Sequence, residues 1–255
     1  MAKSKIAISI SKSLLNVIDQ YTDSNIIMSR SHAIEYLIKK ALKNEPINTA
    51  IILVHENHHH HMSYNYKNKT LLENNINFFE KFGIQNIYLI TKNANKFNHL
   101  KFSGINFKVV EEKICNGTGN AINIIKDKLP HTFIVLNGDT FNDFNLQEMI
   151  KAHLNNDAMA TIGLTSLDKP EMRGSVTLNG NAIIDFKEKQ PTKSFIINAG
   201  IYILNSEIFN YFTKNTKSIE SDIFPKLAKE KKLQGYFTYG TFIHAPDVNK
   251  QKWYQ

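Results

Sequence analysis

The sequence predicts an α/β protein made of a small N-terminal unit and a larger sheet domain. From residue 47 onward, short apolar runs alternate with segments of helical periodicity, which is typical of a mostly parallel sheet flanked by helices. The preceding residues instead follow the order strand, helix, helix, and Pro46 marks the boundary. We therefore expect one domain over residues 1–45 and another over residues 46–255, with ligands at the carboxyl ends of the parallel strands.

Composition limits the class of protein further. Hydrophobic residues make up 42% of the 255 residues and charged residues 21%, as in an ordinary globular chain. No run approaches the roughly 18 apolar residues that span a bilayer, and the polar start is unlike a signal peptide. We expect a cytoplasmic protein that makes no membrane contact, in which the single cysteine, Cys115, forms no internal disulfide. The formal charge of +8 permits a polyanionic partner without requiring one.

The N-terminal residues predict one strand and two amphipathic helices. Ile6, Ile8 and Ile10 alternate with small or polar residues over 5–11, which is the period of a half-buried strand. A first helix begins near Ser11 or Ser13, and a second begins after Ser29. A unit of about 45 residues is too small to bury such apolar faces comfortably. We therefore expect a homodimer or a higher assembly.

Residues 3–43 resemble the ribbon-helix-helix repressors of the CopG type, most specifically in "MSRSHAIEYLIKKAL". The resemblance implies a dimer whose two-stranded ribbon enters the major groove of double-stranded DNA. A dimerisation module without DNA affinity is the alternative. The implied base-facing positions are Lys3, Lys5, Ala7 and Ser9, and the implied phosphate site is Ser29, Arg30 and Ser31 at a helix N-terminus.

In the larger domain, three polar stretches follow predicted strands. Strands are expected over 49–54, 84–91 and 132–140, with helices over 71–83, ended by Gly83, and over 119–129, closed by Pro130. The polar stretches are His55–His61, Asn137–Thr140 and Gly240–Asp247. We expect them to share the edge of the sheet where ligands bind.

Four motifs of this domain resemble, in order and spacing, the sugar-1-phosphate nucleotidyltransferases, and among them the heptose- and mannose-1-phosphate guanylyltransferases. They are "FIVLNGDTFNDFNL", "GSVTLNGNAIIDFKEK", "FIINAGIYILN" and "SIESDIFPKLA". The resemblance implies a GT-A-like, Rossmann-type fold and a reaction of an NTP with a sugar 1-phosphate that uses Mg²⁺ and releases pyrophosphate. By the same resemblance Asp139 holds the metal, and the ligand-binding residues are Gly117 near the base, Asn137 and Asp139, and Glu188, Lys189 and Asn198 at the sugar phosphate. Taken singly, each could instead be a turn residue or part of a solvated pair.

The chain departs from that family after its first strand. The family has a loop of the form G-G-x-G-T-R-L, whose glycines admit the nucleotide and whose arginine clamps its phosphates. Here the loop reads "HENHHHH" and holds five of the ten histidines. The family's Lys-Pro is also absent, so Lys67 or Lys69 would replace its lysine, and His244 stands at the family's second metal ligand. If the domain is active, Asp139 and Lys69 are the expected catalytic residues.

The histidines allow three interpretations: a solvated loop, a tag remnant or a transition-metal site. Imidazole ligands suit Zn²⁺ or Ni²⁺ better than Mg²⁺. The ligands of that site would come from Asp139, His244, His55, His58, His59, His60 and His61.

Together these features predict a DNA-binding transcriptional regulator whose catalytically degenerate nucleotidyltransferase-like domain senses a nucleotide or a sugar phosphate. The alternative is an active sugar-1-phosphate nucleotidyltransferase with a fused DNA-binding head. A third possibility is a storage or assembly protein with neither activity.

Overall fold

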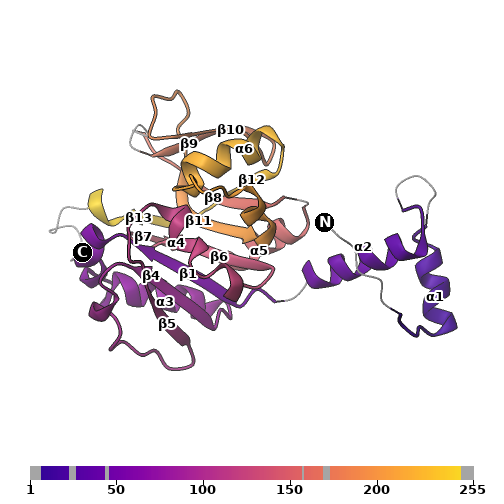
Figure 1. Cartoon of the computed structure of the whole chain (residues 1–255). Coiled ribbons are helices and arrows are strands. Elements are labelled where there is room, and N and C mark those ends of the chain that lie inside the picture. Colours follow the sequence, from indigo (N-terminus) through magenta and orange to yellow (C-terminus); the bar gives the residue numbers. More distant parts are fainter. Residues whose placement is uncertain (1–6, 23–26, 44–45, 157, 169–172, 248–255) are drawn as a thin grey trace. The chain divides into compact units, whose positions relative to one another are not determined.

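The computed structural model (Figure 1) divides into two units, Met1–Pro46 (unit 1) and Ile47–Gln255 (unit 2). The structure describes all residues except 1–6, 23–26, 44–45, 157, 169–172 and 248–255. None of the described helices is long and apolar enough to cross a bilayer.

Unit 1 contains two helices, α1 (Lys12–Asp19) and α2 (Arg30–Lys43). Ser11 caps α1 by accepting a hydrogen bond from Leu14 N at 3.3 Å, and Ser29 caps α2 through His32 N at 3.2 Å. The strand expected over 5–11 is not formed in its described part, since residues 7–11 have no regular structure. A strand of a two-stranded ribbon forms its backbone hydrogen bonds with a second strand. In the expected dimer, that second strand belongs to another copy of the chain.

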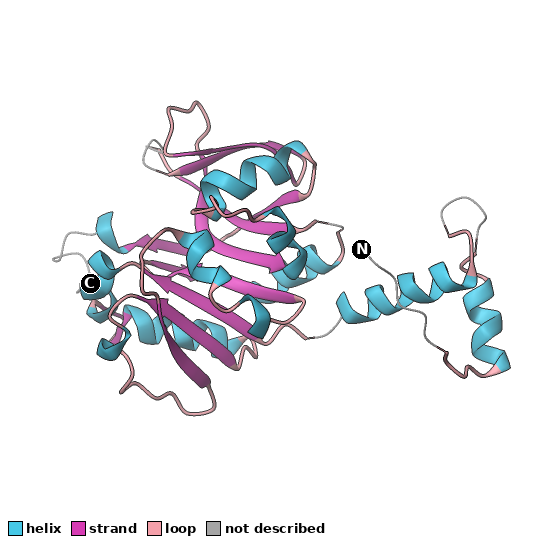
Figure 2. Ribbon diagram, in the orientation of Figure 1, coloured by secondary structure: helices cyan, strands magenta, loops and turns pink. Residues whose placement is uncertain are grey.

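Unit 2 is built on a nine-stranded sheet of order β5-β4-β1-β6-β11-β8-β12-β10-β9, with helices on both faces (Figure 2). The strands are β1 Thr49–Val54, β4 Asn86–Thr91, β5 Asn106–Glu111, β6 Thr132–Asn137, β8 Ala160–Ser166, β9 Gly174–Asn179, β10 Ala182–Glu188, β11 Ile196–Asn205 and β12 Leu233–Phe237. Two small ladders accompany the sheet: β2 Asn65–Tyr66 with β3 Lys69–Thr70, and β7 Thr140–Asp143 with β13 Thr241–His244.

The expectation of a mostly parallel sheet is correct for β5, β4, β1 and β6 but wrong beyond them, because β11 runs antiparallel to both β6 and β8. The β9–β10 pair is a tight hairpin, in which Asn179 pairs with Ala182 and Gly180 lies in the left-handed region at φ +59°. Such a turn joins antiparallel neighbours, whereas parallel strands need a long crossover. The sheet is therefore mixed.

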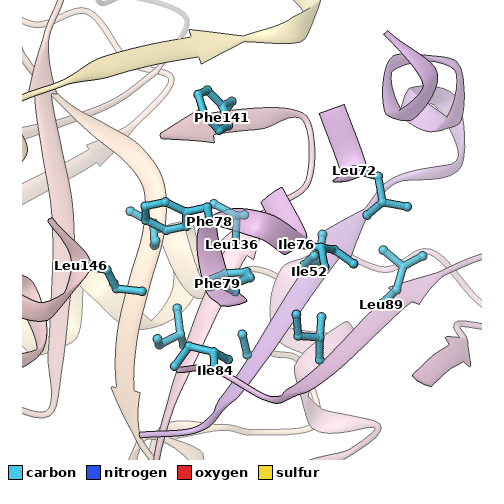
Figure 3. Packing of buried hydrophobic residues seen from close by; sticks show 14 of the residues in the cluster. Ile52, Leu72, Ile76, Phe78, Phe79, Ile84, Leu89, Leu136, Phe141 and Leu146 are labelled. Carbon is cyan, nitrogen blue, oxygen red and sulfur yellow. The ribbon is translucent and has the colours of Figure 1, made fainter. Parts of the chain in front are cut away.

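Helices cover the sheet because its strands alternate their side chains between two cores. Ile52 and Val54 of β1 face one cluster, whereas Ile51 and Leu53 face the other. The first core lies under α3 (Leu71–Lys81) and α5 (Leu146–Leu154), and Figure 3 shows Ile76, Phe78 and Phe79 of α3 packed there. The second core lies under α4 (Thr118–Asn123) and α6 (Phe224–Lys229).

Shorter helical turns complete the unit. The helix expected over 119–129 ends at Asn123, because Ile125 N and Lys128 N bond to residues three positions earlier and the chain tightens into a 3₁₀ turn. The 3₁₀ turns are η1 Glu56–Ser63, η2 Ala94–Lys96, η3 Lys126–Lys128, η4 Ser206–Tyr211 and η6 Ala245–Asp247, and η5 Ile219–Ile223 is a π-turn.

Candidate functional site

A pocket of about 760 Å³ lies in unit 2, where β6, β10, β11 and β13 end or begin. All six ligand-binding residues expected from the sequence line it, namely Gly117, Asn137, Asp139, Glu188, Lys189 and Asn198. His58 and His244 line it as well. The three polar stretches predicted to share the sheet edge thus each contribute to one cavity.

Asp139 lies in the tight turn between β6 and β7. Gly138 N donates to Leu53 O at 2.7 Å, and a Cβ at Gly138 would lie 2.6 Å from Val54 Cγ2, so only glycine fits there. The buried Asn75 of α3 donates to Thr140 O at 3.0 Å, and Ala245 N donates to Asp139 O at 2.8 Å. The turn is therefore held by both α3 and the segment after β13.

The Asp139 carboxylate contacts two imidazoles through one oxygen. His58 Nδ1 lies 2.8 Å from Oδ2, and His244 Nε2 lies 3.6 Å from the same atom. Burial alone would raise the pKa of Asp139, but hydrogen bonds from His244 and His58 outweigh it and hold this pKa well below its usual range. Asp139 is therefore an anion at any physiological pH.

A buried hydrogen-bond network forms another wall of the pocket. The Tyr202 hydroxyl donates to Glu220 Oε1 at 3.0 Å and accepts from Asn198 Nδ2 at 2.8 Å. Glu220 Oε2 also accepts from Thr118 Oγ1 at 2.5 Å and from Ser218 Oγ at 2.7 Å. Because Asn198 Oδ1 accepts from Gly200 N at 2.8 Å, both polar atoms of Asn198 are committed to the protein. Asn198 therefore shapes the wall more than it offers free groups to a ligand.

Glu188 and Lys189 lie at the end of β10. Burial, and then the neighbouring Glu220, raise the pKa of Glu188 to about 7, although Lys189 and Arg173 oppose that rise. Lys189 adopts φ +49°, a left-handed conformation that costs energy for a residue other than glycine. The structure thus brings an easily protonated carboxyl and a strained lysine together beside the cavity.

The glycine at position 117 has a packing role. Its φ is +93°, and a Cβ there would lie 2.5 Å from Lys217 O. Gly119 N donates to the same carbonyl oxygen at 2.8 Å. Gly117 lines the pocket, as expected, but the absence of a side chain is required by the backbone of residue 217.

The histidine-rich segment forms a 3₁₀ turn, η1, and its His55 and His60 are exposed. His55 caps the turn by accepting from Asn57 N at 3.2 Å, and His59 Nε2 lies 2.7 Å from Thr91 Oγ1. His61 is buried, and burial lowers its pKa to about 4. Of the five histidines in this segment, His58 alone contacts the Asp139 carboxylate. The His60 ring packs on the His61 ring, with 3.9 Å between their centroids.

The donors around Asp139 are one carboxylate and two imidazoles. Proteins usually bind Mg²⁺ through one or two carboxylates together with substrate phosphates and water. Asp139 supplies one such carboxylate, and binding of Mg²⁺ stays a prediction. Among the described residues, no group of three His, Cys, Asp or Glu side chains is arranged to hold a metal ion. Binding of Zn²⁺ or Ni²⁺ stays a prediction.

The lysines expected to replace the family's phosphate-binding lysine lie elsewhere. Lys67 occupies the β2–β3 turn at φ +50°, with Nζ 5.2 Å from the Tyr66 ring centre, and Lys69 is exposed. Neither lines the pocket, and a catalytic role for Lys69 stays a prediction. The short β2–β3 hairpin leads directly into α3.

The residues expected to contact DNA lie in unit 1. Lys3 and Lys5 are outside the described residues, whereas Ala7, Ser9, Ser29 and Ser31 are exposed. The Arg30 guanidinium forms two hydrogen bonds with Asp19, from Nε at 2.6 Å and from Nη2 at 2.8 Å. A phosphate bound at Arg30 would compete with this carboxylate.

Sequence reasoning did not find two charged residues of the pocket lining, Arg173 and Glu220, nor the buried Tyr202 that donates to Glu220. Tyr202 and Glu220 lie inside motifs that carried the family resemblance, but nothing in their spacing marks them as partners. Arg173 carries a clearer compositional signal, because it is the one arginine of residues 46–255 in a lysine-rich chain.

Comparison with known proteins shows the family. The Nucleotidyl transferase family profile matches residues 26–253. A probable mannose-1-phosphate guanylyltransferase 3 of Arabidopsis thaliana is 36% identical over 146 residues, which cover 54% of this chain and 43% of that protein. The D-glycero-alpha-D-manno-heptose 1-phosphate guanylyltransferase of Aneurinibacillus thermoaerophilus is 29% identical over 184 residues, covering 69% of this chain and 79% of that protein.

The chain spans about two fifths of the length of several of the curated relatives that it matches, the Arabidopsis protein among them. Among solved structures, HddC from Yersinia pseudotuberculosis has a TM-score of 0.66 and 22% identity, covering 81% of this chain and 99% of that one. A putative glucose-1-phosphate thymidylyltransferase from Bacillus anthracis has a TM-score of 0.68 and 19% identity, covering 77% of this chain and 89% of that one. The profile match over most of its length shows that the chain belongs to the nucleotidyl transferase family.

Proposed function

We propose that unit 2 is a sugar-1-phosphate nucleotidyltransferase, which joins the nucleotidyl group of an NTP to a sugar 1-phosphate. The observation that carries the proposal is the convergence of Asp139, Glu188 and Lys189 on one pocket of a domain of this family. The guanylyltransferase names of the relatives favour mannose 1-phosphate or a heptose 1-phosphate as the sugar, and GTP as the nucleotide.

In this reaction an oxygen of the sugar phosphate attacks the α-phosphorus of the NTP. A new P–O bond forms while the bond to the β-phosphate oxygen breaks, and pyrophosphate leaves with its electron pair. The task of the protein is positioning and charge neutralisation. Lys189 and Arg173 provide cations beside the pocket, and Glu188 at a pKa of about 7 can accept or donate a hydrogen bond to a sugar hydroxyl.

The test is pyrophosphate release from each NTP with mannose 1-phosphate or a heptose 1-phosphate, with glucose 1-phosphate as the comparison sugar. We expect turnover with one pair, and its loss in Asp139→Asn, because the Asp139 carboxylate holds His58 and His244 in place in the pocket wall. Asp143→Asn is the matched control, since Asp143 is an exposed carboxylate four residues along the same segment. Saturable binding of a sugar phosphate without pyrophosphate release would contradict the proposal and favour a ligand sensor.

A second function is DNA binding by a dimer of unit 1. The exposed apolar residues of unit 1 favour such a dimer. Leu14 and Val17 of α1 are 52% and 47% exposed, and Met28 is 74% exposed, in a unit whose buried cluster centres on Ile18, Ile27 and Ala33. A second copy of unit 1 would cover such residues, and a ribbon-helix-helix dimer forms in that way.

Salt-dependent binding to random duplex DNA tests this second function. We expect Arg30→Gln to weaken binding and to reduce the salt slope by about 1, the amount that one neutralised phosphate contributes. Asp19→Asn should strengthen binding, since it releases Arg30. A monomer in solution, or a duplex affinity indifferent to both substitutions, contradicts it.

A further inference from the structure

The charges around the pocket pose a problem for an anionic ligand. A sugar 1-phosphate carries negative charge, which a cavity of net negative charge repels. Among the described residues of the pocket lining, two cations can receive the phosphate, and both lie at the open end of the β9–β10 hairpin. The acidic groups that line the cavity are Asp139, Glu188, Glu220 and Asp247, and the cations are Arg173 and Lys189.

Arg173 is held inward by partners of unequal burial. Its Nη2 lies 2.8 Å from His244 Nδ1 and also contacts the Asp247 carboxylate. The Arg173 side chain is 15% exposed, whereas that of Asp247 is 60% exposed on the short η6 turn. Asp247 also contacts His244 Nδ1 at 3.2 Å, and both of its contacts can be replaced by water at this exposed position, while Arg173 needs an anionic partner wherever it lies in the pocket.

The backbone places Arg173 beside Lys189. Lys189 N donates to Arg173 O at 3.2 Å, and the register pairs Glu188 with Gly174. A Cβ at Gly174 would lie 2.6 Å from Glu188 Oε2, so this glycine admits the carboxylate close to the hairpin. Arg173 thus lies between Glu188, on the side assigned to the sugar, and His244, which contacts Asp139.

We propose that Arg173 is the phosphate receptor of this pocket, and that the carboxylate of Asp247 occupies it until a sugar 1-phosphate takes that place. A phosphate presents the same pair of oxygens to a guanidinium as a carboxylate does, and it carries more charge. On exchange, Arg173 keeps its charge-assisted hydrogen bonds and Asp247 becomes solvated. The inference rests on the proposed function and assigns the sugar phosphate to an arginine that directly precedes β9.

The exchange predicts opposite effects of substitution at its two partners. In calorimetric titrations of the full chain with mannose 1-phosphate, we expect Arg173→Gln to weaken binding by about 10- to 100-fold, as loss of a charge-assisted pair does. Arg173→Lys should recover only part of this loss, because lysine lacks the planar fork. Asp247→Asn should bind several-fold more tightly, since the competing carboxylate is gone. Mannose without phosphate should bind all four proteins alike.

Lys187→Gln is the matched control, because it removes one cation from the same hairpin, 49% exposed and outside the pocket lining. The inference is overturned if Arg173→Gln leaves mannose 1-phosphate affinity unchanged, or if Asp247→Asn weakens binding as Arg173→Gln does, which would make the pair structural. Asp247→Asn keeps the test decisive should Arg173→Gln fail to fold.

Inorganic phosphate separates this inference from the proposed function. Phosphate binding that depends on Arg173 and increases in Asp247→Asn, without pyrophosphate release from any NTP, would retain the receptor and exclude the transferase. Turnover whose KM for the sugar phosphate is the same in wild type, Arg173→Gln and Asp247→Asn would retain the transferase and exclude the receptor. Failure of the wild type to bind either mannose 1-phosphate or inorganic phosphate overturns the receptor outright.

Discussion

Glu188→Gln should stabilise the ligand-free protein at alkaline pH and have little effect at acidic pH. The Glu188 side chain is 21% exposed, and burial with the nearby Glu220 raises its pKa from the ordinary 4.5 to about 7. A carboxyl whose pKa is raised on folding binds its proton more tightly in the native state. Stability is therefore full below about pH 4.5, falls as the pH rises towards 7, and stays lower above it.

The size of the effect follows from the pKa. One pKa unit corresponds to about 1.4 kcal/mol, so a rise from 4.5 to about 7 costs the wild type about 3 kcal/mol of stability at pH 8. Glutamine keeps the shape of the side chain and bears no charge. In a domain of this size, the difference corresponds to a Tm about 6 to 12 °C higher for the variant.

Thermal unfolding followed by circular dichroism at pH 5 and pH 8 checks this prediction. The gain in Tm should appear at pH 8 and largely vanish at pH 5. Asp185→Asn, on the same strand and 52% exposed, is the control and should change little at either pH. A gain of equal size at both pH values, or a decrease at pH 8, would refute the assignment of a buried, charged Glu188.

Three further predictions concern the scaffold of the pocket. Thr70→Ala removes the side-chain half of the capping box of α3, in which Glu73 N donates to Thr70 Oγ1 at 3.2 Å, and should cost about 1 kcal/mol in urea unfolding; Thr70→Ser should cost less, and equal losses would contradict the cap. Gly117→Ala should destabilise more than Gly83→Ala, since both have positive φ but only Gly117 faces a backbone oxygen within 2.5 Å; equal losses in calorimetry would refute the clash. His58→Ala should accelerate amide exchange in η1 by about tenfold, because it removes a charge-assisted hydrogen bond to Asp139, without affecting β6; unchanged exchange would mean that His58 does not anchor η1.

Local sequence patterns predict the parallel half of the sheet well. β1, β4 and β6 were identifiable because each is a short apolar run bounded by polar residues, and α3 because its apolar spacing ends at Gly83. The position of β11 between β6 and β8 depends on pairing between distant segments, which no local period encodes. The mixed character of the sheet could therefore not be read from the chain.

The same limit applies to the candidate site. Asp139, Glu188 and Lys189 lie in recognisable motifs at strand ends, and they reach the pocket as expected. The contact of Arg173 with Asp247 joins residues 74 positions apart, and the contact of His58 with Asp139 depends on a 3₁₀ turn that has no apolar period. Sequence reasoning locates the pocket, whereas its pairings require the fold.

The complete burial of β1 has a consequence for how this protein can change. All six residues of β1 are buried, and its register is fixed on both sides by β4 and β6. The position of β1 therefore does not depend on the residues that follow it. The start of α3 is fixed separately, by its own cap at Thr70. Residues 55–69 lie between these two fixed points, so the polar side chains at this edge of the pocket can be exchanged as long as Met62, Tyr64 and Tyr66 keep their packing against the first core.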